Sequence, residues 1–165
     1  MAKEDDILAH EIGKAGQFGG KLGGKIIGDS LAGAAGGLGG YLGGSWAARF
    51  LPTERYQLEV KLRADPRTIL AKVYAYLCGK GRVEDSEELR KSPNPTVSGV
   101  VGSGFFNMNP AIIYAEIVEV EGETCKVILT GAAKEGLIKQ RTAEEAVGRL
   151  AEALKELGES PTTSR

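Results

Sequence analysis

The chain of 165 residues has few of the side chains from which most enzyme sites are built: one histidine, one tryptophan and two cysteines. His10 stands beside Glu11 near the start of the chain, where we interpret it as a solvated helix residue rather than a catalytic base. Nucleophilic triads and HExxH sites need a histidine placed among their other members. The phosphate loop GxxxxGK followed by Ser or Thr is also missing. We therefore expect no catalytic residue, no cofactor, no metal ligand and no enzymatic activity.

Cys78 and Cys125 lie far apart and lack CxxC spacing, which argues against a zinc site. We expect free, largely buried thiols in a reducing compartment, with one long-range disulfide as the alternative. An excess of one charge is missing too, since 21 basic and 22 acidic residues give a net charge of -1. A nucleic-acid partner is not expected, because binding phosphates needs a positive surface.

The first residues, MAKEDD, are polar and no apolar signal core follows them. A secretory signal peptide needs an apolar stretch behind a positively charged start. We expect a cytoplasmic protein without a cleavable signal peptide, and association with a membrane is left open.

Glycine is in excess, with 24 residues in the chain and 14 of them between Gly13 and Gly44. Many recur every four residues, a spacing that places them on one slowly drifting face of a helix. This pattern resembles the glycine zipper of tightly packed membrane and assembly helices. The glycines assigned to helix packing or oligomerisation are Gly16, Gly20, Gly24, Gly28, Gly33, Gly36, Gly37, Gly40 and Gly44.

We expect helices over about residues 6–28 and 30–50, forming either one bent helix or a hairpin. At about 1 kcal/mol per glycine relative to alanine, 14 glycines cost about 14 kcal/mol, which only close packing could offset. A flexible linker is the alternative, but linkers pair glycine with serine and polar residues rather than with large apolar ones. An apolar stripe opposite the glycines is formed by Leu31, Ala35, Leu38 and Leu42.

Residues 31–48 carry no charge, and these 18 residues are close to the shortest helix that spans a bilayer. Trp46 and Arg49 stand where anchors at a membrane interface would stand. The many glycines and few leucines make insertion a weak prediction. Packing against another protein helix is the preferred interpretation, and a lipid bilayer is the alternative.

The remainder predicts a compact α+β domain over residues 54–158, between a glycine-zipper segment at 1–51 and a polar tail at 159–165. Alternating apolar and charged residues over 55–63 predict a strand with one solvated face. Asp65 and Pro66 then begin a helix. Three apolar runs follow at 96–106, 111–120 and 124–132, with a tight turn at 121–123. Thr142 and Glu145 form a capping box for the last helix. The predicted order is β-α-β(3–4)-α, with an antiparallel sheet packed by the long C-terminal helix.

This order of elements resembles the TBP-like architecture that helix-grip (Bet v 1/START-like) proteins share, in which the terminal helix packs across a curved sheet. The resemblance covers residues 54–158 and implies an apolar ligand between sheet and helix. Gly99, Gly102 and Gly104 in one strand would open an apolar groove there or let another backbone approach, and a bulged strand is the alternative.

The leading hypothesis is a structural protein that self-associates through its glycine-zipper helices into a homo-oligomer, which is membrane-associated in one version. One alternative is a small carrier of an apolar ligand. Another is a leaderless effector that perturbs a target membrane.

Overall fold

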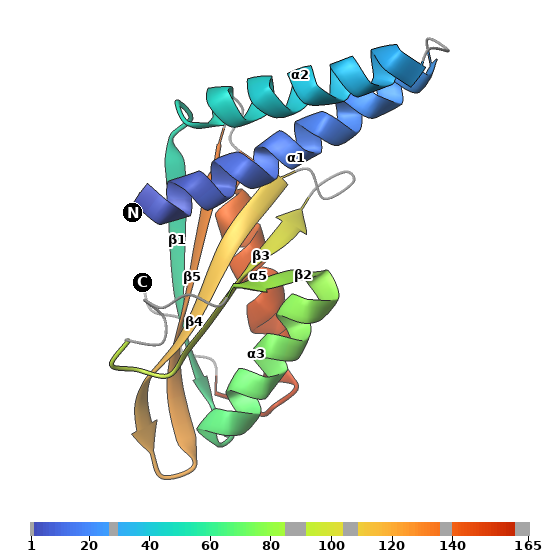
Figure 1. Ribbon diagram of the computed structural model, residues 1–165. Helices are drawn as coiled ribbons and strands as arrows, with labels where there is room; N and C mark the ends of the chain where they lie inside the picture. Colours follow the sequence, from blue (N-terminus) through green and yellow to red (C-terminus); the bar gives the residue numbers. More distant parts are fainter. Residues whose placement is uncertain (1, 27–29, 85–91, 104–108, 136–139, 161–165) are drawn as a thin grey trace.

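The computed structural model describes residues 2–26, 30–84, 92–103, 109–135 and 140–160. The first two helices, α1 (Ala2–Ile26) and α2 (Ser30–Ala48), lie side by side as a hairpin that projects beyond one end of the sheet (Figure 1). The hairpin, rather than one bent helix, is therefore the outcome. Gly28, predicted at the end of the first helix, lies outside the described residues.

Among the described residues, a single antiparallel sheet with strand order β2-β3-β4-β5-β1-β6 forms the rest of the fold together with two helices. The α+β class and the predicted element order are confirmed, with four described strands between these two helices. The strands are β1 (Thr53–Leu62), β2 (Gly81–Glu84), β3 (Thr96–Ser103), β4 (Asn109–Glu121), β5 (Thr124–Lys134) and β6 (Glu159–Ser160), and the helices are α3 (Pro66–Lys80) and α5 (Thr142–Lys155).

Local sequence signals account for several element ends. The carboxylate of Asp65 accepts hydrogen bonds from the backbone N–H groups of Arg67 (3.0 Å) and Thr68 (3.1 Å), as an N-cap does. Gly122 has φ of 59° in the turn between β4 and β5, a conformation that costs glycine nothing. The four-residue strand β2 was not predicted, because Gly79 and Gly81 indicated only the end of a helix.

The main core lies between the inner face of the sheet and the helices α3 and α5. At the centre of β5, Gly131 brings the last helix close: a Cβ there would lie 2.7 Å from both the carbonyl oxygen of Ala143 and Cγ2 of Val147. The space between this strand and α5 is filled by fully buried side chains such as Leu129 and Leu150. Here the helix and sheet are in direct contact.

On the opposite face of the sheet, α1 packs against β4 and β5 at one end of the sheet (Figure 1). Leu8 is fully buried there and packs with Val100 and Ile112, and Ile7 and Tyr114 border this small cluster. The sheet thus carries two unequal apolar layers, a large one under α3 and α5 and a small one under α1.

The start of α5 differs from the predicted capping box. Thr142 lies inside the first turn, Arg141 occupies the N-cap with φ of 55°, and no side chain of the cap residue makes a capping bond. Instead the buried carboxylate of Glu135 accepts the backbone N–H groups of Gln140 (2.6 Å) and Thr142 (2.7 Å). Glu145, the predicted partner, forms an ion pair with Arg149. The local motif fails because a carboxylate from the end of the preceding strand already takes these amides.

Replacing Glu135 by glutamine should lower the free energy of unfolding by about 2 kcal/mol at pH 7, the usual cost of losing a hydrogen bond to a buried charge. Burial raises the pKa of Glu135, but the N–H groups of Thr142 and Gln140 outweigh burial, so the pKa lies below its usual value. A lowered pKa stabilises the fold above the unfolded pKa of about 4.3 and loses this contribution as the pH falls below it. Urea titrations at pH 7 and pH 3 should therefore show a difference between the two proteins that shrinks in acid.

The matched control is Glu145→Gln, which removes the carboxylate of the predicted capping box. It should cost less than about 0.5 kcal/mol, because exposed ion pairs one helical turn apart contribute little. Equal losses in the two variants would contradict the role given to Glu135.

One smaller expectation needs correction, and the predicted polar tail contributes a short strand. Both cysteines are free, but only Cys125 is buried, whereas Cys78 is exposed on α3 and does not fit the expected pair of buried thiols. In the predicted polar tail, Ser160 and Glu159 pair with Lys61 and Leu62 of β1 as the short strand β6.

Candidate functional site

The hairpin is held together where two backbones meet at glycine. A Cβ at Gly16 would lie less than 3.0 Å from the carbonyl oxygen of Gly40, and a Cβ at Gly40 equally close to that of Gly16. Real Cβ atoms do not approach that closely, so these two positions admit only glycine without a shift of the helices. Two of the predicted packing glycines therefore face each other within one chain.

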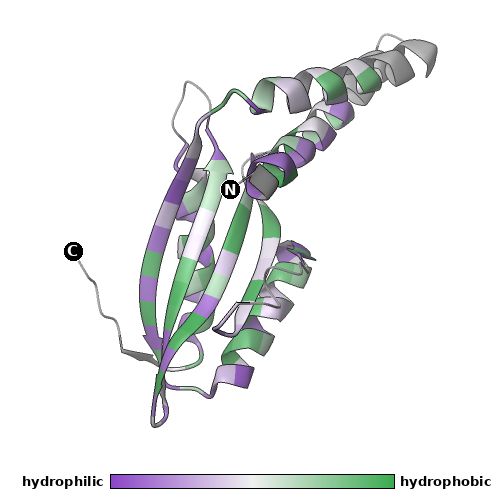
Figure 2. Ribbon diagram, turned by 60° about the vertical axis from the view of Figure 1, so that its left-hand side comes forward, coloured by the Kyte–Doolittle hydropathy of each residue, from purple (hydrophilic) through white to green (hydrophobic). Residues whose placement is uncertain are grey.

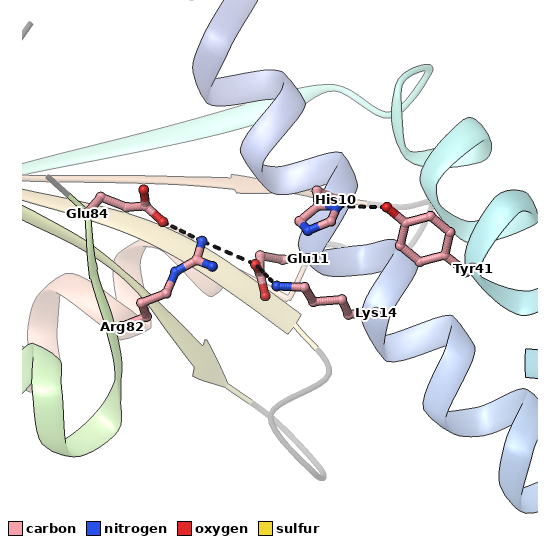
Figure 3. Close-up of polar contacts among 6 residues, drawn as sticks. All are labelled: His10, Glu11, Lys14, Tyr41, Arg82 and Glu84. Atoms are coloured by element: carbon pink, nitrogen blue, oxygen red, sulfur yellow. Dashed lines mark hydrogen bonds and ion pairs between the residues drawn. The ribbon is translucent and has the colours of Figure 1, made fainter. Parts of the chain in front are cut away.

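Further along the hairpin, small residues of one helix receive side chains of the other. Gly13 is buried, and a Cβ there would lie 3.0 Å from the ring of Tyr41. The hydroxyl of Tyr41 lies 2.7 Å from Nδ1 of His10, which links the two helices on their exposed side (Figure 3). His10 thus has a structural contact inside the hairpin. Gly44 lies against the backbone of Ile12.

Charged residues clamp the start of α1 to the sheet. The side chain of Lys134 is almost fully buried and lies 2.7 Å from Asp5, which also accepts a hydrogen bond of 2.6 Å from the hydroxyl of Thr53. These two hydrogen bonds, from Lys134 first and Thr53 second, lower the pKa of Asp5. Glu4 pairs with Arg55 of β1. The first turn of the hairpin is therefore fixed to β1 and β5.

A second ionic contact fixes α1 to the edge strand β2. Arg82 lies 3.3 Å from Glu11 and also pairs with Glu84, while Glu11 bonds Lys14 at 2.9 Å on its own helix (Figure 3). Because all four side chains are partly solvated, each pair contributes only a few tenths of a kcal/mol up to about 1 kcal/mol. Their effect is to orient the hairpin.

The outer face of α2 is apolar and exposed. Each step of four residues turns a helix by about 40°, so Leu38, Leu42 and Trp46 form one ridge along the side away from Gly40. Leu38, Leu42 and Trp46 are 59%, 56% and 66% exposed, and Phe50 just beyond the helix is 72% exposed and packs edge-on against Trp46. Figure 2 shows the described part of α2 largely white and green, with less purple than α1.

A row of glycines runs beside this ridge. A Cβ at Gly39 or Gly43 would meet no atom within 4 Å, so these two positions border open space. We call Leu38, Leu42, Trp46 and Phe50 together with Gly39 and Gly43 the α2 surface. The two glycines on this side pack against no other described part of the chain.

The other predicted zipper positions are placed as follows. Gly37 is buried in α2, whereas Gly28 lies outside the described residues. Gly20 and Gly24 belong to α1, and Gly33 and Gly36 belong to α2. Their role in oligomerisation stays a prediction.

The predicted interface residues Trp46 and Arg49 are both exposed at the end of the hairpin next to the sheet. Within the described ranges, no helix combines the length and the apolar character needed to cross a bilayer.

Of the predicted strand glycines, Gly99 borders no groove, whereas Gly102 borders a cavity. A Cβ at Gly99 would lie close to the carbonyl oxygen of Arg82 and 3.1 Å from Leu77, so neighbouring chain fills this position. Gly104 lies outside the described residues. Gly102 borders a cavity of about 500 Å³ between the end of α3, the end of β3 and the side of α5.

This cavity combines apolar and cationic walls. Its lining comprises Tyr76, Gly79, Lys80, Val101, Gly102, Ala146 and Arg149. Burial raises the pKa of Tyr76, while the charge of Arg149, which lines the same cavity, opposes this rise. Tyr76 therefore keeps its proton at neutral pH and can donate a hydrogen bond. In the described part of the chain, no cluster of three or more His, Cys, Asp or Glu side chains could hold a metal ion.

Sequence reasoning did not find the cavity residues. Lys80 and Arg149 belong to helices distant in the sequence, and only the packing of α3 beside α5 brings them together. A usable signal existed for Tyr76, which follows Val73 by three residues and therefore borders the apolar face of α3.

No family model matches the chain, and a comparison with curated proteins finds no significant relative. Among solved structures, the Zhui aromatase/cyclase from Streptomyces sp. R1128 is similar, with 16% sequence identity and a TM-score of 0.29. The similarity covers 64% of this chain and 86% of that chain.

This neighbour is an enzyme, so it contradicts the expectation that the chain has no enzymatic activity, and that expectation is given up. The expectation rested on the missing histidine-based sites, and catalysis does not require a histidine. At a TM-score of 0.29 the similarity carries no argument for any particular activity of this chain.

Proposed function

We propose that the protein is an assembly protein that self-associates through the α2 surface. The observation that carries the proposal is a helix without a charged residue, which over residues 37–48 is covered on one side by α1 and bare on the other. A helix that is apolar all round belongs in an interior. The bare side of α2 therefore needs a cover that the described chain does not supply.

The shape of the α2 surface favours a second copy as that cover. Large side chains stand at intervals of four residues, and Gly39 and Gly43 form a groove with the same interval beside them. Ridges of this kind fit into the grooves of a facing helix, which is the commonest form of helix packing. Because ridge and groove lie side by side on one helix, two copies related by a twofold axis can each fill the groove of the other. Binding to a lipid bilayer would not require such a groove.

The strength of the association follows from the apolar area. Four side chains per copy, each more than half exposed, contribute on the order of 1 kcal/mol apiece when buried, or about 8 kcal/mol across a dimer. Association costs at least about 4 kcal/mol of lost freedom. The difference of about 4 kcal/mol corresponds to a dissociation constant of about 1 mM, so we expect a complex that forms at millimolar concentrations.

The test is the mass of the full chain by light scattering over about 0.1 to 3 mM, a range that brackets this expectation. The wild type should shift towards a dimer or larger assembly, and Leu42→Ser combined with Trp46→Ser should stay monomeric at every concentration. Tyr74→Ser is the matched control, because Tyr74 is a helical aromatic with 53% exposure outside the hairpin, and it should assemble as the wild type does.

Two results would overturn self-association. One is a wild-type chain that remains monomeric at the highest concentration. The other is a monomer that sediments with phosphatidylglycerol vesicles and loses this binding in the double variant, since a bilayer would then cover the α2 surface. Leakage of dye from those vesicles would further favour a membrane-perturbing effector.

A second candidate function is the binding of a small molecule, and the cavity between α3, β3 and α5 favours it. Its volume of about 500 Å³ falls in the range of ligand pockets. Titration of naphthalene derivatives into the protein, followed by the amide resonances of Gly79 and Gly102, tests this function. The cavity lies apart from the α2 surface, so the two functions are compatible.

A further inference from the structure

We infer that the cavity beside α5 takes an organic anion: a carboxylate or phosphate attached to a small apolar body. This inference rests on the second candidate function and names the class of ligand for that site. It differs from the wholly apolar ligand that the helix-grip resemblance implies by its charged group.

The charges of the lining carry the inference. Lys80 extends from the last turn of α3 and Arg149 from α5, so cationic side chains border the cavity on two walls. Among the described residues of the lining there is no carboxylate. Among the described lining residues, none would balance the two cations if the ligand were neutral.

The other lining groups fit the rest of such a molecule. Tyr76 is half-buried and protonated, so its hydroxyl donates to an anionic oxygen. Val101 and Ala146 are buried and supply an apolar floor of modest size. An aromatic ring or short acyl chain suits this floor, with its charged group towards the two cations.

Two features weaken the attraction without removing it. Arg149 forms an ion pair with Glu145, but this pair is half-exposed, and a guanidinium has further donors for a second acceptor. The carbonyl groups at the end of α3 carry partial negative charge, which disfavours an anion there. The positive charge of Lys80, in the last turn of this helix, offsets that effect. The expected affinity is therefore modest, in the range of about 10 to 500 μM.

The experiment compares 2-naphthoate with 2-naphthamide, two probes of the same shape and different charge. Both are titrated into the full-length chain by calorimetry and by the amide resonances of Gly79, Val101 and Gly102. The naphthoate should bind at least about tenfold more tightly than the amide and shift these resonances. Replacing both Lys80 and Arg149 by glutamine should weaken naphthoate about tenfold and leave naphthamide unchanged, because each partly exposed cation contributes up to about 1 kcal/mol.

The matched control is Lys72→Gln combined with Lys155→Gln, which removes two cations from the same two helices outside the cavity. Its affinity for naphthoate should equal that of the wild type. Equal binding of the two probes at the cavity amides would overturn the preference for anions while keeping the binding function. Shifts elsewhere, or none up to millimolar concentrations, would overturn both.

Discussion

Valine at position 131 is expected to lower the free energy of unfolding by about 3 kcal/mol, near the upper end of what extra atoms cost in a packed core. Gly131 lies in the middle of β5 under α5, where a Cβ would come within 2.7 Å of Ala143 and of Val147. Ala143 is 3% exposed and Val147 fully buried, so neither neighbour can turn into solvent. The helix would have to move away from the strand along its whole contact. Urea unfolding, monitored by far-ultraviolet circular dichroism, measures the loss of unfolding free energy.

Gly148→Ala is the control for this variant, since Gly148 belongs to α5 and a Cβ there would meet no atom within 4 Å. Alanine inside a helix is favoured over glycine by about 1 kcal/mol, so this variant should be more stable than the wild type. If Gly131→Val unfolded at the wild-type urea concentration, α5 could not lie as close to the sheet as described.

Gly40→Ala is expected to open the helical hairpin while the sheet stays folded. The added methyl would meet the carbonyl oxygen of Gly16 at less than 3.0 Å, which costs about 3 kcal/mol, and helix propensity returns about 1 kcal/mol. The net loss of about 2 kcal/mol should speed hydrogen exchange of the amides of α1 and α2 by about thirtyfold. The amides of β5 around Leu129 should exchange at their wild-type rates.

Gly39→Ala makes the same change one residue away, at a position bordering open space. It gains the helix propensity without the clash, so the hairpin amides should exchange more slowly. The pair of variants separates backbone contact from propensity. Equal effects at the two positions would contradict the face-to-face contact of Gly16 with Gly40.

Periodic patterns carried most of the fold that could be predicted. The four-residue glycine repeat and the alternation in β1 each reflect one geometry, so the helices and the strand follow directly from them. Asp65 before Pro66 and Gly122 in the turn are equally local. The capping box failed because Thr142 and Glu145 match a local motif that a distant carboxylate, Glu135, replaces.

The sites were harder to predict because they depend on long-range packing. The groove expected at Gly99 is filled by Leu77, whose reach across β3 depends on where α3 lies. Gly131 carried a signal that was not used, since glycine in a strand interior marks a close backbone approach. The burial of Lys134 against Asp5 has no sequence signature, as the two residues lie far apart in the sequence. The apolar stripe on α2 was predicted, whereas its exposure follows only from the placement of α1.

The pairing of β1 with β5 also bears on events at the ribosome. Thr53 lies opposite Lys134, 81 positions later in the sequence. At ordinary rates of translation, the ribosome therefore takes about 4 to 16 s after making β1 to complete its partner strand β5. The bare ridge of α2 emerges before β1 and stays uncovered through that interval. Self-association through this ridge, as proposed above, would then begin between nascent chains on one messenger before their sheets close.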